Sequence, residues 1–194
     1  MENIETISLS DIAVIIDPCY DMGDLGCGAV LEGILPGTWV CGVDYHDYWE
    51  GKPGHVGSLY GHHIDEPDID FDLNKLEWVA LCGVDSGQLG IFDYAYFAHS
   101  VEIDPKRNSD WYREVCKTTL TELLAGAKDE RCYVSSSGYG DGGYAVYIAR
   151  NEAGQIIGIR IPFISPAKKA DPNEEEEEED SFDVDDYWSA EDDA

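Results

Sequence analysis

Short runs of residues that are either alternately hydrophobic and polar or continuously apolar recur along this chain, and glycine, proline, asparagine or aspartate separates one run from the next. This pattern is typical of β-strands. The clearest case is a pair of alternating runs on either side of Asn151-Glu152-Ala153-Gly154, which predicts a β-hairpin. The predicted strands cover residues 12–16, 37–43, 78–84, 90–97, 144–150 and 155–163.

One segment has helical periodicity instead. Apolar residues such as Trp111 and Val115 fall on one face of residues 111–125. Asp110 is suited to cap the start of this helix, and Gly126 is suited to end it. The order of elements predicts an α+β, β-rich fold, a compact sandwich or open barrel of mostly antiparallel strands with one main helix at about residues 111–125.

Residues 44–61 have a weak hydrophobic period but many aromatic side chains. We therefore expect surface loops or edge strands here, with part of the aromatic cluster exposed. Tyrosine and tryptophan are frequent anchors of protein interfaces. The predicted partner-binding residues of this segment are Tyr45, Tyr48, Trp49 and Tyr60.

The chain is strongly acidic, with 41 Asp and Glu against 12 Lys and Arg and a net charge of −29. Residues 171–194 contain fourteen of the acids and no base. Because like charges repel, this end is expected to be disordered. The predicted organisation is one globular β-rich domain at residues 1–168 and an acidic disordered tail at residues 169–194. Within the tail, Phe182, Tyr187 and Trp188 are expected to contact a partner.

This charge excludes some classes of function and favours others. A negative field repels nucleic acid and anionic membranes, and it attracts basic proteins or cations. No run of residues approaches the roughly 18 apolar residues of a membrane helix, and the first residues lack a signal-peptide pattern. A cytoplasmic protein is therefore expected, and its six cysteines are expected to be reduced. Since no CxxC or HxxxH pair indicates a zinc site, most of the cysteines are expected to be buried in the core.

Three motifs occur in order along the chain. They are Asp17-Pro18-Cys19-Tyr20, the stretch of residues 78–93 that contains Asp85-Ser86-Gly87-Gln88, and the Ser- and Gly-rich residues 136–144. Together they resemble a family of uncharacterised bacterial and phage proteins with a domain of unknown function. The resemblance spans residues 10–165. It implies a small β-rich fold, no established activity and occurrence in phage genomes, so the cytoplasm of a bacterial host cell is the expected location.

The third motif has two interpretations. Its backbone N–H groups and hydroxyls can cradle a phosphate, although it lacks the lysine of a P-loop and does not open a helix. Alternatively, its glycines and aspartate form only a shaped connection between strands. Under the first interpretation the ligand-binding residues are Asp85, Ser86, Gln88, Ser137, Tyr139, Asp141 and Tyr144. The candidate ligands of a divalent cation are Asp85, Asp93 and Asp141, and no other cofactor is predicted.

The features together predict a non-enzymatic, phage-encoded binding or inhibitor protein. It captures a basic protein surface by mimicking the charge of nucleic acid, and it does not bind nucleic acid directly. Two alternatives stay open. One is a module that binds a nucleotide-like or metal-bound small ligand, and the other is a metal-assisted hydrolase that uses the same aspartates.

Overall fold

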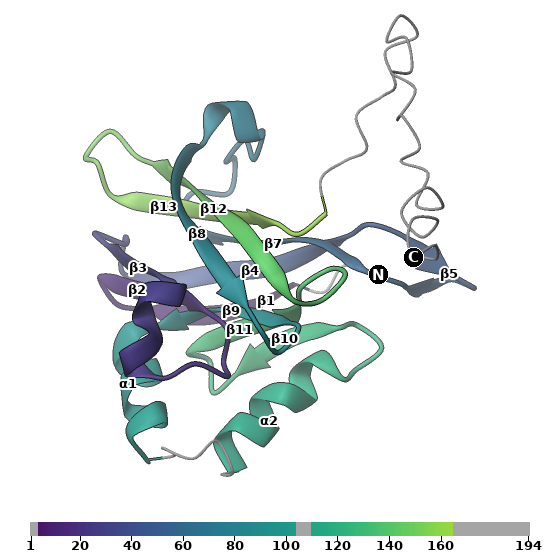
Figure 1. The fold of residues 1–194 in the computed structure, drawn as a ribbon. Helices are drawn as coiled ribbons and strands as arrows, with labels where there is room; N and C mark the ends of the chain where they lie inside the picture. Colours follow the sequence, from purple (N-terminus) through teal and green to yellow (C-terminus); the bar gives the residue numbers. More distant parts are fainter. Residues whose placement is uncertain (1–3, 104–109, 165–194) are drawn as a thin grey trace, which may run out of the picture.

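The computed structural model describes residues 4–103 and 110–164, which form two antiparallel sheets packed face to face, with two helices against one of them (Figure 1). From edge to edge, the six-stranded sheet contains β1 (Ile4–Leu9), β4 (Gly37–Tyr45), β7 (Val56–His63), β13 (Ile156–Pro162), β12 (Gly142–Arg150) and β8 (Glu77–Val84). The five-stranded sheet contains β10 (Ala125–Lys128), β11 (Cys132–Ser136), β9 (Gln88–Asp93), β2 (Ile12–Ile16) and β3 (Ala29–Glu32). The remaining elements are a small hairpin of β5 (Tyr48–Trp49) and β6 (Lys52–Pro53), helices α1 (Tyr94–Ile103) and α2 (Asp110–Thr119), and the 3₁₀ turns η1 (Met22–Cys27) and η2 (Leu73–Lys75).

Two apolar layers hold these elements together. Between the sheets, Trp39, Ile91 and Tyr133 are completely buried. On the other face of the five-stranded sheet, Phe92 packs against Phe97 of α1. Consecutive residues of β9 therefore face opposite layers, and every position of this strand is buried. The molecule has three layers: six strands, five strands and helices.

The predicted fold class is confirmed, because the chain is β-rich and its antiparallel sheets form a sandwich that is not closed into a barrel. The predicted hairpin is also present. β12 and β13 pair in antiparallel register, and Asn151 N donates to Gln155 O across the turn. Here the local pattern and the turn chemistry determine the structure.

The helix predicted at residues 111–125 is shorter, because α2 ends at Thr119 and Ala125 begins β10. Threonine is a poor helix former, and its hydroxyl competes for backbone partners. Thr118 Oγ1 donates to Val115 O, and Thr121 Oγ1 donates to Thr118 O. The backbone then turns at Leu124, whose φ is 56°.

The strand predicted at residues 90–97 ends at Asp93, and α1 begins at Tyr94. The alternating aromatic residues of this segment favour a strand, but the Asp93 carboxylate caps a helix. Tyr96 N donates to Asp93 Oδ1 at 3.1 Å, which satisfies one of the free N–H groups at the helix start.

The prediction of loops or edge strands for residues 44–61 is wrong in its second half, because β7 lies inside the six-stranded sheet between β4 and β13. Its period is weak since both faces are covered. Leu59 points into the core, whereas Tyr60 packs against the Phe71 ring at 5.6 Å.

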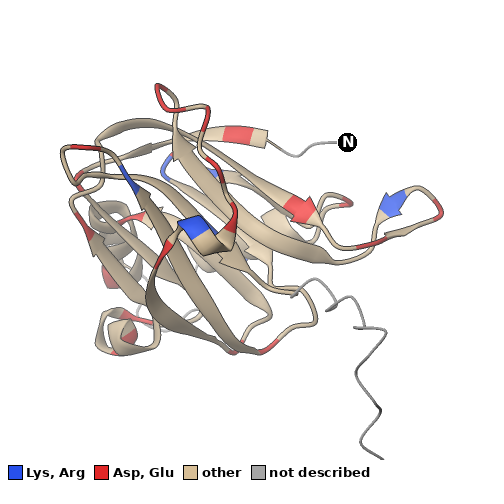
Figure 2. Cartoon of the chain, turned by 90° about the horizontal axis from the view of Figure 1, so that it is seen from above, with Lys and Arg blue, Asp and Glu red and all other residues tan. Residues whose placement is uncertain are grey.

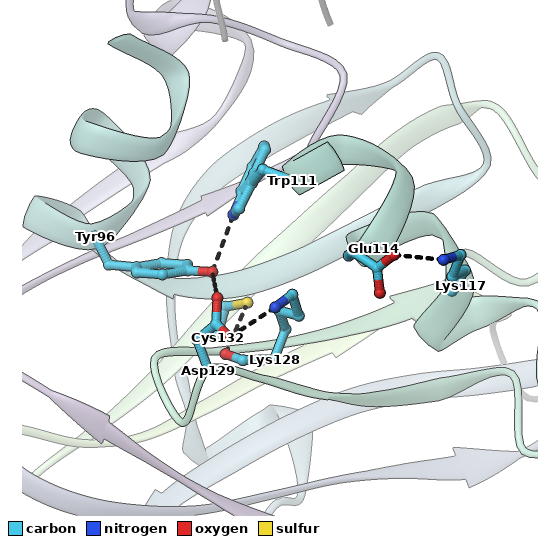
Figure 3. Close-up of polar contacts among 7 residues, drawn as sticks. All are labelled: Tyr96, Trp111, Glu114, Lys117, Lys128, Asp129 and Cys132. Atoms are coloured by element: carbon cyan, nitrogen blue, oxygen red, sulfur yellow. Dashed lines mark hydrogen bonds and ion pairs between the residues drawn. The ribbon is translucent and has the colours of Figure 1, made fainter. Parts of the chain in front are cut away.

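Polar contacts join the helices to the turn between β10 and β11 (Figure 3). Tyr96 Oη accepts from Trp111 Nε1 at 2.9 Å and donates to Asp129 Oδ2 at 2.7 Å. Lys128 Nζ lies 2.6 Å from the other Asp129 oxygen. Burial raises the pKa of Tyr96 above its ordinary value, so the hydroxyl keeps its proton and stays a donor.

Two expectations concern the ends of the chain and the membrane. The predicted tail at residues 169–194, with Phe182, Tyr187 and Trp188, lies outside the described residues. Neither helix in the part of the chain that the structure describes has the length and apolarity needed to cross a membrane.

Candidate functional site

The first two sequence motifs meet at one end of the sandwich, around the buried carboxylate of Asp17. Its Oδ2 accepts from Asp85 N at 2.8 Å and from Ser86 N at 2.7 Å. Its Oδ1 accepts from Ser86 Oγ at 2.6 Å and from Cys19 N at 2.8 Å. One side chain at the end of β2 thus holds the turn that connects β8 to β9.

The third motif joins the same place. Ser137 N donates to Gly87 O at 3.0 Å, and Ser137 Oγ donates to Gly140 O at 2.8 Å. Tyr144 Oη lies 2.7 Å from Gly140 O and 2.8 Å from Ser137 O. Gly138 has a φ of +63°, which favours glycine, and a Cβ there would lie 3.0 Å from Phe163. We call residues 17–20, 85–88 and 137–144 the motif junction.

Helix α2 completes the motif junction with residues that the sequence analysis missed. Gln88 Nε2 donates to Cys116 Sγ at 3.5 Å, and Thr119 Oγ1 donates to Gln88 Oε1 at 2.9 Å. Burial, with a hydrogen bond to Cys116, raises the pKa of Tyr112 to about 12. The spacing of Tyr112, Cys116 and Thr119 places all three on one helix face, and this polar stripe was the available signal.

The predicted ligand residues of the motif junction are mostly occupied by internal contacts. The side chains of Ser86, Gln88, Ser137 and Tyr144 all bond within the protein. These contacts support the interpretation of the third motif as a shaped strand connection. Asp85 and Asp141 are exposed, and the Asp85 carboxylate also accepts a hydrogen bond from the Tyr20 side chain.

The three candidate metal ligands do not come together. Asp85 and Asp141 flank the paired residues Val84 and Gly142, so these two lie near each other. Asp93 is at the opposite end of β9. Within residues 4–103 and 110–164, no group of three His, Cys, Asp or Glu side chains is arranged to hold a metal ion.

Asp93 has a structural partner instead of a metal. It is completely buried, and Arg131 Nη2 lies 2.6 Å from its Oδ1. Burial opposes ionisation of this carboxylate. Hydrogen bonds from Ser10, Arg131 and Tyr96 outweigh that effect and place the pKa of Asp93 below its ordinary value.

A second cluster lies on the hairpin of β5 and β6, which Figure 1 shows extending away from the two sheets. Tyr48 is 54% exposed and Trp49 is 69% exposed. Asp47 holds the hairpin: it accepts from His55 N at 2.7 Å, lies 3.0 Å from His55 Nδ1, and accepts from Trp49 Nε1 at 3.3 Å. The hydrogen bond with the His55 side chain is the main cause that lowers the pKa of Asp47.

Tyr139, which was predicted as a ligand contact, belongs to this second cluster. It is 71% exposed, and its ring centroid lies 4.8 Å from that of His55. We call Tyr48, Trp49, His55 and Tyr139 the aromatic surface. Contacts with Asp47 and His55 thus connect a predicted ligand residue, Tyr139, with the predicted partner-binding residue Trp49.

The other two predicted anchors are less exposed, although the Tyr45 ring centroid lies 5.7 Å from that of Tyr48. Tyr45 is half-buried, and its hydroxyl donates to Leu123 O at 2.6 Å. Tyr60 is half-buried against Phe71. Of the four aromatic anchors predicted at residues 45–60, only Tyr48 and Trp49 are widely exposed.

Among the described residues, most basic side chains form ion pairs, whereas many acidic side chains do not. Acidic residues are spread over many loops and strand ends, whereas Lys and Arg are few (Figure 2). Most of those bases are already neutralised by neighbouring carboxylates, so the remaining acids determine the field around the protein. The ion-paired bases are Lys52, Lys75, Lys117, Lys128, Arg131, Arg150 and Arg160.

All six cysteines are free thiols. Cys41, Cys82 and Cys132 are buried, as predicted, and burial raises the pKa of Cys82 to about 12. Cys116 is half-buried in the motif junction, and Cys27 is exposed. The prediction of mostly buried cysteines therefore describes three of the six.

Comparison with known proteins yields one match. No curated protein and no solved structure matches the chain. A protein family model does match, over a region that contains the second and third motifs but not Asp17. Residues 71–161 match the family described as "Protein of unknown function (DUF4241)", and the resemblance to an uncharacterised domain family is thereby confirmed.

Proposed function

We propose that this protein is a non-enzymatic binding protein that captures a basic protein surface, and that the aromatic surface supplies its anchors. The observation that carries this proposal is the wide exposure of Tyr48, Trp49 and Tyr139 on a protein with 41 acids and 12 bases. Exposed tyrosine and tryptophan provide contact area at small entropic cost, and unpaired acids attract a partner of opposite charge.

The aromatic surface is suited to binding because its side chains are held in place before a partner arrives. The Asp47 carboxylate fixes both His55 and Trp49. Lys52 on the hairpin pairs with Glu122 at 2.6 Å, which ties β6 to the loop after α2. A preorganised surface loses less entropy on binding.

The rest of the proposal follows from charge and from the family. Carboxylates on a folded surface mimic the charge of nucleic acid, which favours a nucleic-acid-handling protein as the partner. A bacterial or phage source and a cytoplasmic location belong to the same proposal. The acidic residues 171–194 would raise the association rate by electrostatic steering.

The test uses the full chain and immobilised basic proteins with a pI above about 9. Binding should be clear at about 50 mM salt and fall steeply at about 500 mM, because salt screens exposed charges. Trp49→Ala should weaken binding about tenfold without a change in net charge. Leu120→Ala, which also removes an exposed apolar side chain, is the matched control.

The proposal is wrong if no basic protein binds at low salt. It is also wrong if Trp49→Ala and Leu120→Ala have equal effects, since binding would then depend on net charge alone. Comparison with a chain that ends at Ala170 separates the contribution of the acidic end from that of the aromatic surface.

A further inference from the structure

β8 is an edge strand with an open outer side. It pairs with β12 along its length and is the last strand of its sheet (Figure 1). Within the described residues, no backbone hydrogen bond from another segment reaches this strand on its other side. Tyr20 and η1 approach only the far end, where a Cβ at Gly83 would lie 3.6 Å from Tyr20 Oη and 3.8 Å from Cys27 O of η1. Residues 77–82 therefore offer backbone N–H and C=O groups to an added strand.

Two large apolar side chains are exposed along this edge. Trp78 is 59% exposed and Leu81 is 62% exposed. Their cross-strand partners on β12 are Tyr147 and Ala145, which flank the buried Val146. Since cross-strand partners share a face of the sheet, Trp78 and Leu81 both point away from the core.

Other edges of the sandwich are protected in ways that β8 is not. β1 is covered, because Ser8 N donates to Glu130 O and Glu5 Oε1 accepts from Ala127 N. β3 is only four residues long and ends in Glu32. β8 begins with a charged residue, Glu77, which pairs with Arg150 of the neighbouring β12 at 2.9 Å. Residues 78–84 contain neither a charged residue nor a proline, the two devices that commonly block strand pairing at an edge.

Two kinds of strand fit this edge, one from a second copy of the chain and one from a basic partner, and charge favours the second. Asp85 directly follows β8 and Asp141 directly precedes the paired end of β12, so two exposed carboxylates flank the same end of the edge. A second copy of the chain would bring the same carboxylates and a further charge of −29. A segment that carries lysine or arginine would instead gain ionic contacts there.

We infer that the β8 edge binds an extended segment of the basic partner by strand addition. The segment lies antiparallel to β8, as in every other pairing of this sheet. Its apolar residues contact Trp78 and Leu81, and its basic residues lie near its own N-terminal end, beside Asp85 and Asp141. The charge of the occupant rests on the proposed function, whereas the site on β8 rests on the open edge.

The test uses the full chain and the peptide Lys-Lys-Val-Thr-Val-Thr-Val. Trp78→Ala and Leu81→Ala should each weaken peptide binding about tenfold, while Leu120→Ala should leave it unchanged. Asp141→Asn should weaken binding about threefold, while Glu152→Gln, a change at the exposed turn at the other end of β12, should not. A peptide with the lysines at its C-terminal end should bind more weakly than the original.

A peptide with N-methyl groups along one edge of its backbone keeps its charge but cannot form the pairing bonds, and it should not bind. Equal binding of this peptide, or no effect of Trp78→Ala, overturns the inference. The proposed function is tested separately, because Trp49→Ala changes the aromatic surface and leaves β8 intact. If basic proteins bind and Trp49→Ala weakens that binding while Trp78→Ala does not, the proposed function stands and the inference about β8 is wrong. A dimer of the chain that Leu81→Lys disrupts would also overturn the inference, since the occupant would then be a second copy.

Discussion

The motif junction and the aromatic surface use polar and aromatic residues in opposite ways. In the motif junction the hydroxyl, amide and carboxylate groups bond to one another, and Asp17 alone accepts four hydrogen bonds. On the aromatic surface a single carboxylate, Asp47, holds side chains whose rings remain exposed. The motif junction thus serves mainly to build the fold, although its residue Tyr139 is exposed and belongs to the aromatic surface, whose Tyr48 and Trp49 lie on a small hairpin.

The largest expected effect is the loss of the Asp17 carboxylate. Asp17→Ala leaves three backbone N–H groups and one hydroxyl without their acceptor in a buried place, which should lower the free energy of unfolding by about 3 kcal/mol or more. Asp141→Ala, at an exposed position of the same junction, should change it by less than about 0.5 kcal/mol. Urea denaturation measures both, and equal values for the two variants would refute the structural role of Asp17.

A smaller effect distinguishes two tyrosines of the third motif. Tyr144→Phe removes a hydroxyl that bonds within the loop and should lower the free energy of unfolding by about 1 kcal/mol. Tyr139→Phe should leave stability unchanged, because the ring is exposed and its hydroxyl forms no hydrogen bond within residues 4–103 and 110–164. Thermal denaturation of both variants tests this difference in stability. Equal melting temperatures of the two variants would contradict it.

Ser135 offers a change in the opposite direction. This residue is completely buried on β11, and among the residues that the structure describes its Oγ has no hydrogen-bond partner. Ser135→Ala removes the desolvated hydroxyl, so the free energy of unfolding should rise by up to about 1 kcal/mol. Ser137→Ala, which removes a bonded hydroxyl nearby in sequence, should lower it. A stabilised Ser137→Ala protein would contradict this comparison.

The smallest effect is a pH dependence at Asp93. Its folded pKa lies below its ordinary value, so its ionised form stabilises the fold above that ordinary value of about 4. The contribution is lost as pH falls through the lowered folded pKa. The wild-type melting temperature should therefore fall more steeply than that of Asp93→Asn on acidification below about pH 4. Parallel curves would show that Asp93 does not contribute.

Short-range sequence patterns predict some elements of this fold and not others. The sequence predicts β12, β13 and the turn at Asn151 from alternation and turn chemistry, and β2 and β8 from short apolar runs, and all of these signals act over a few residues. The end of α2 depends on its threonine side chains, and the start of α1 depends on Asp93, whose carboxylate caps the helix. Burial of Tyr45 and Tyr60 depends on Leu123 and Phe71, which are distant in sequence.

The sequence by itself determined that this is an acidic, β-rich protein with a hairpin near its end and many aromatic residues before β7. Only the tertiary structure decided that Asp85 lies near Asp141 and far from Asp93, that Tyr139 joins Trp49, and that Trp78 is exposed at an open edge. The reason is physical. Strand and turn preferences are local, whereas the neighbours and exposure of a side chain depend on which strands pair and how the sheets stack.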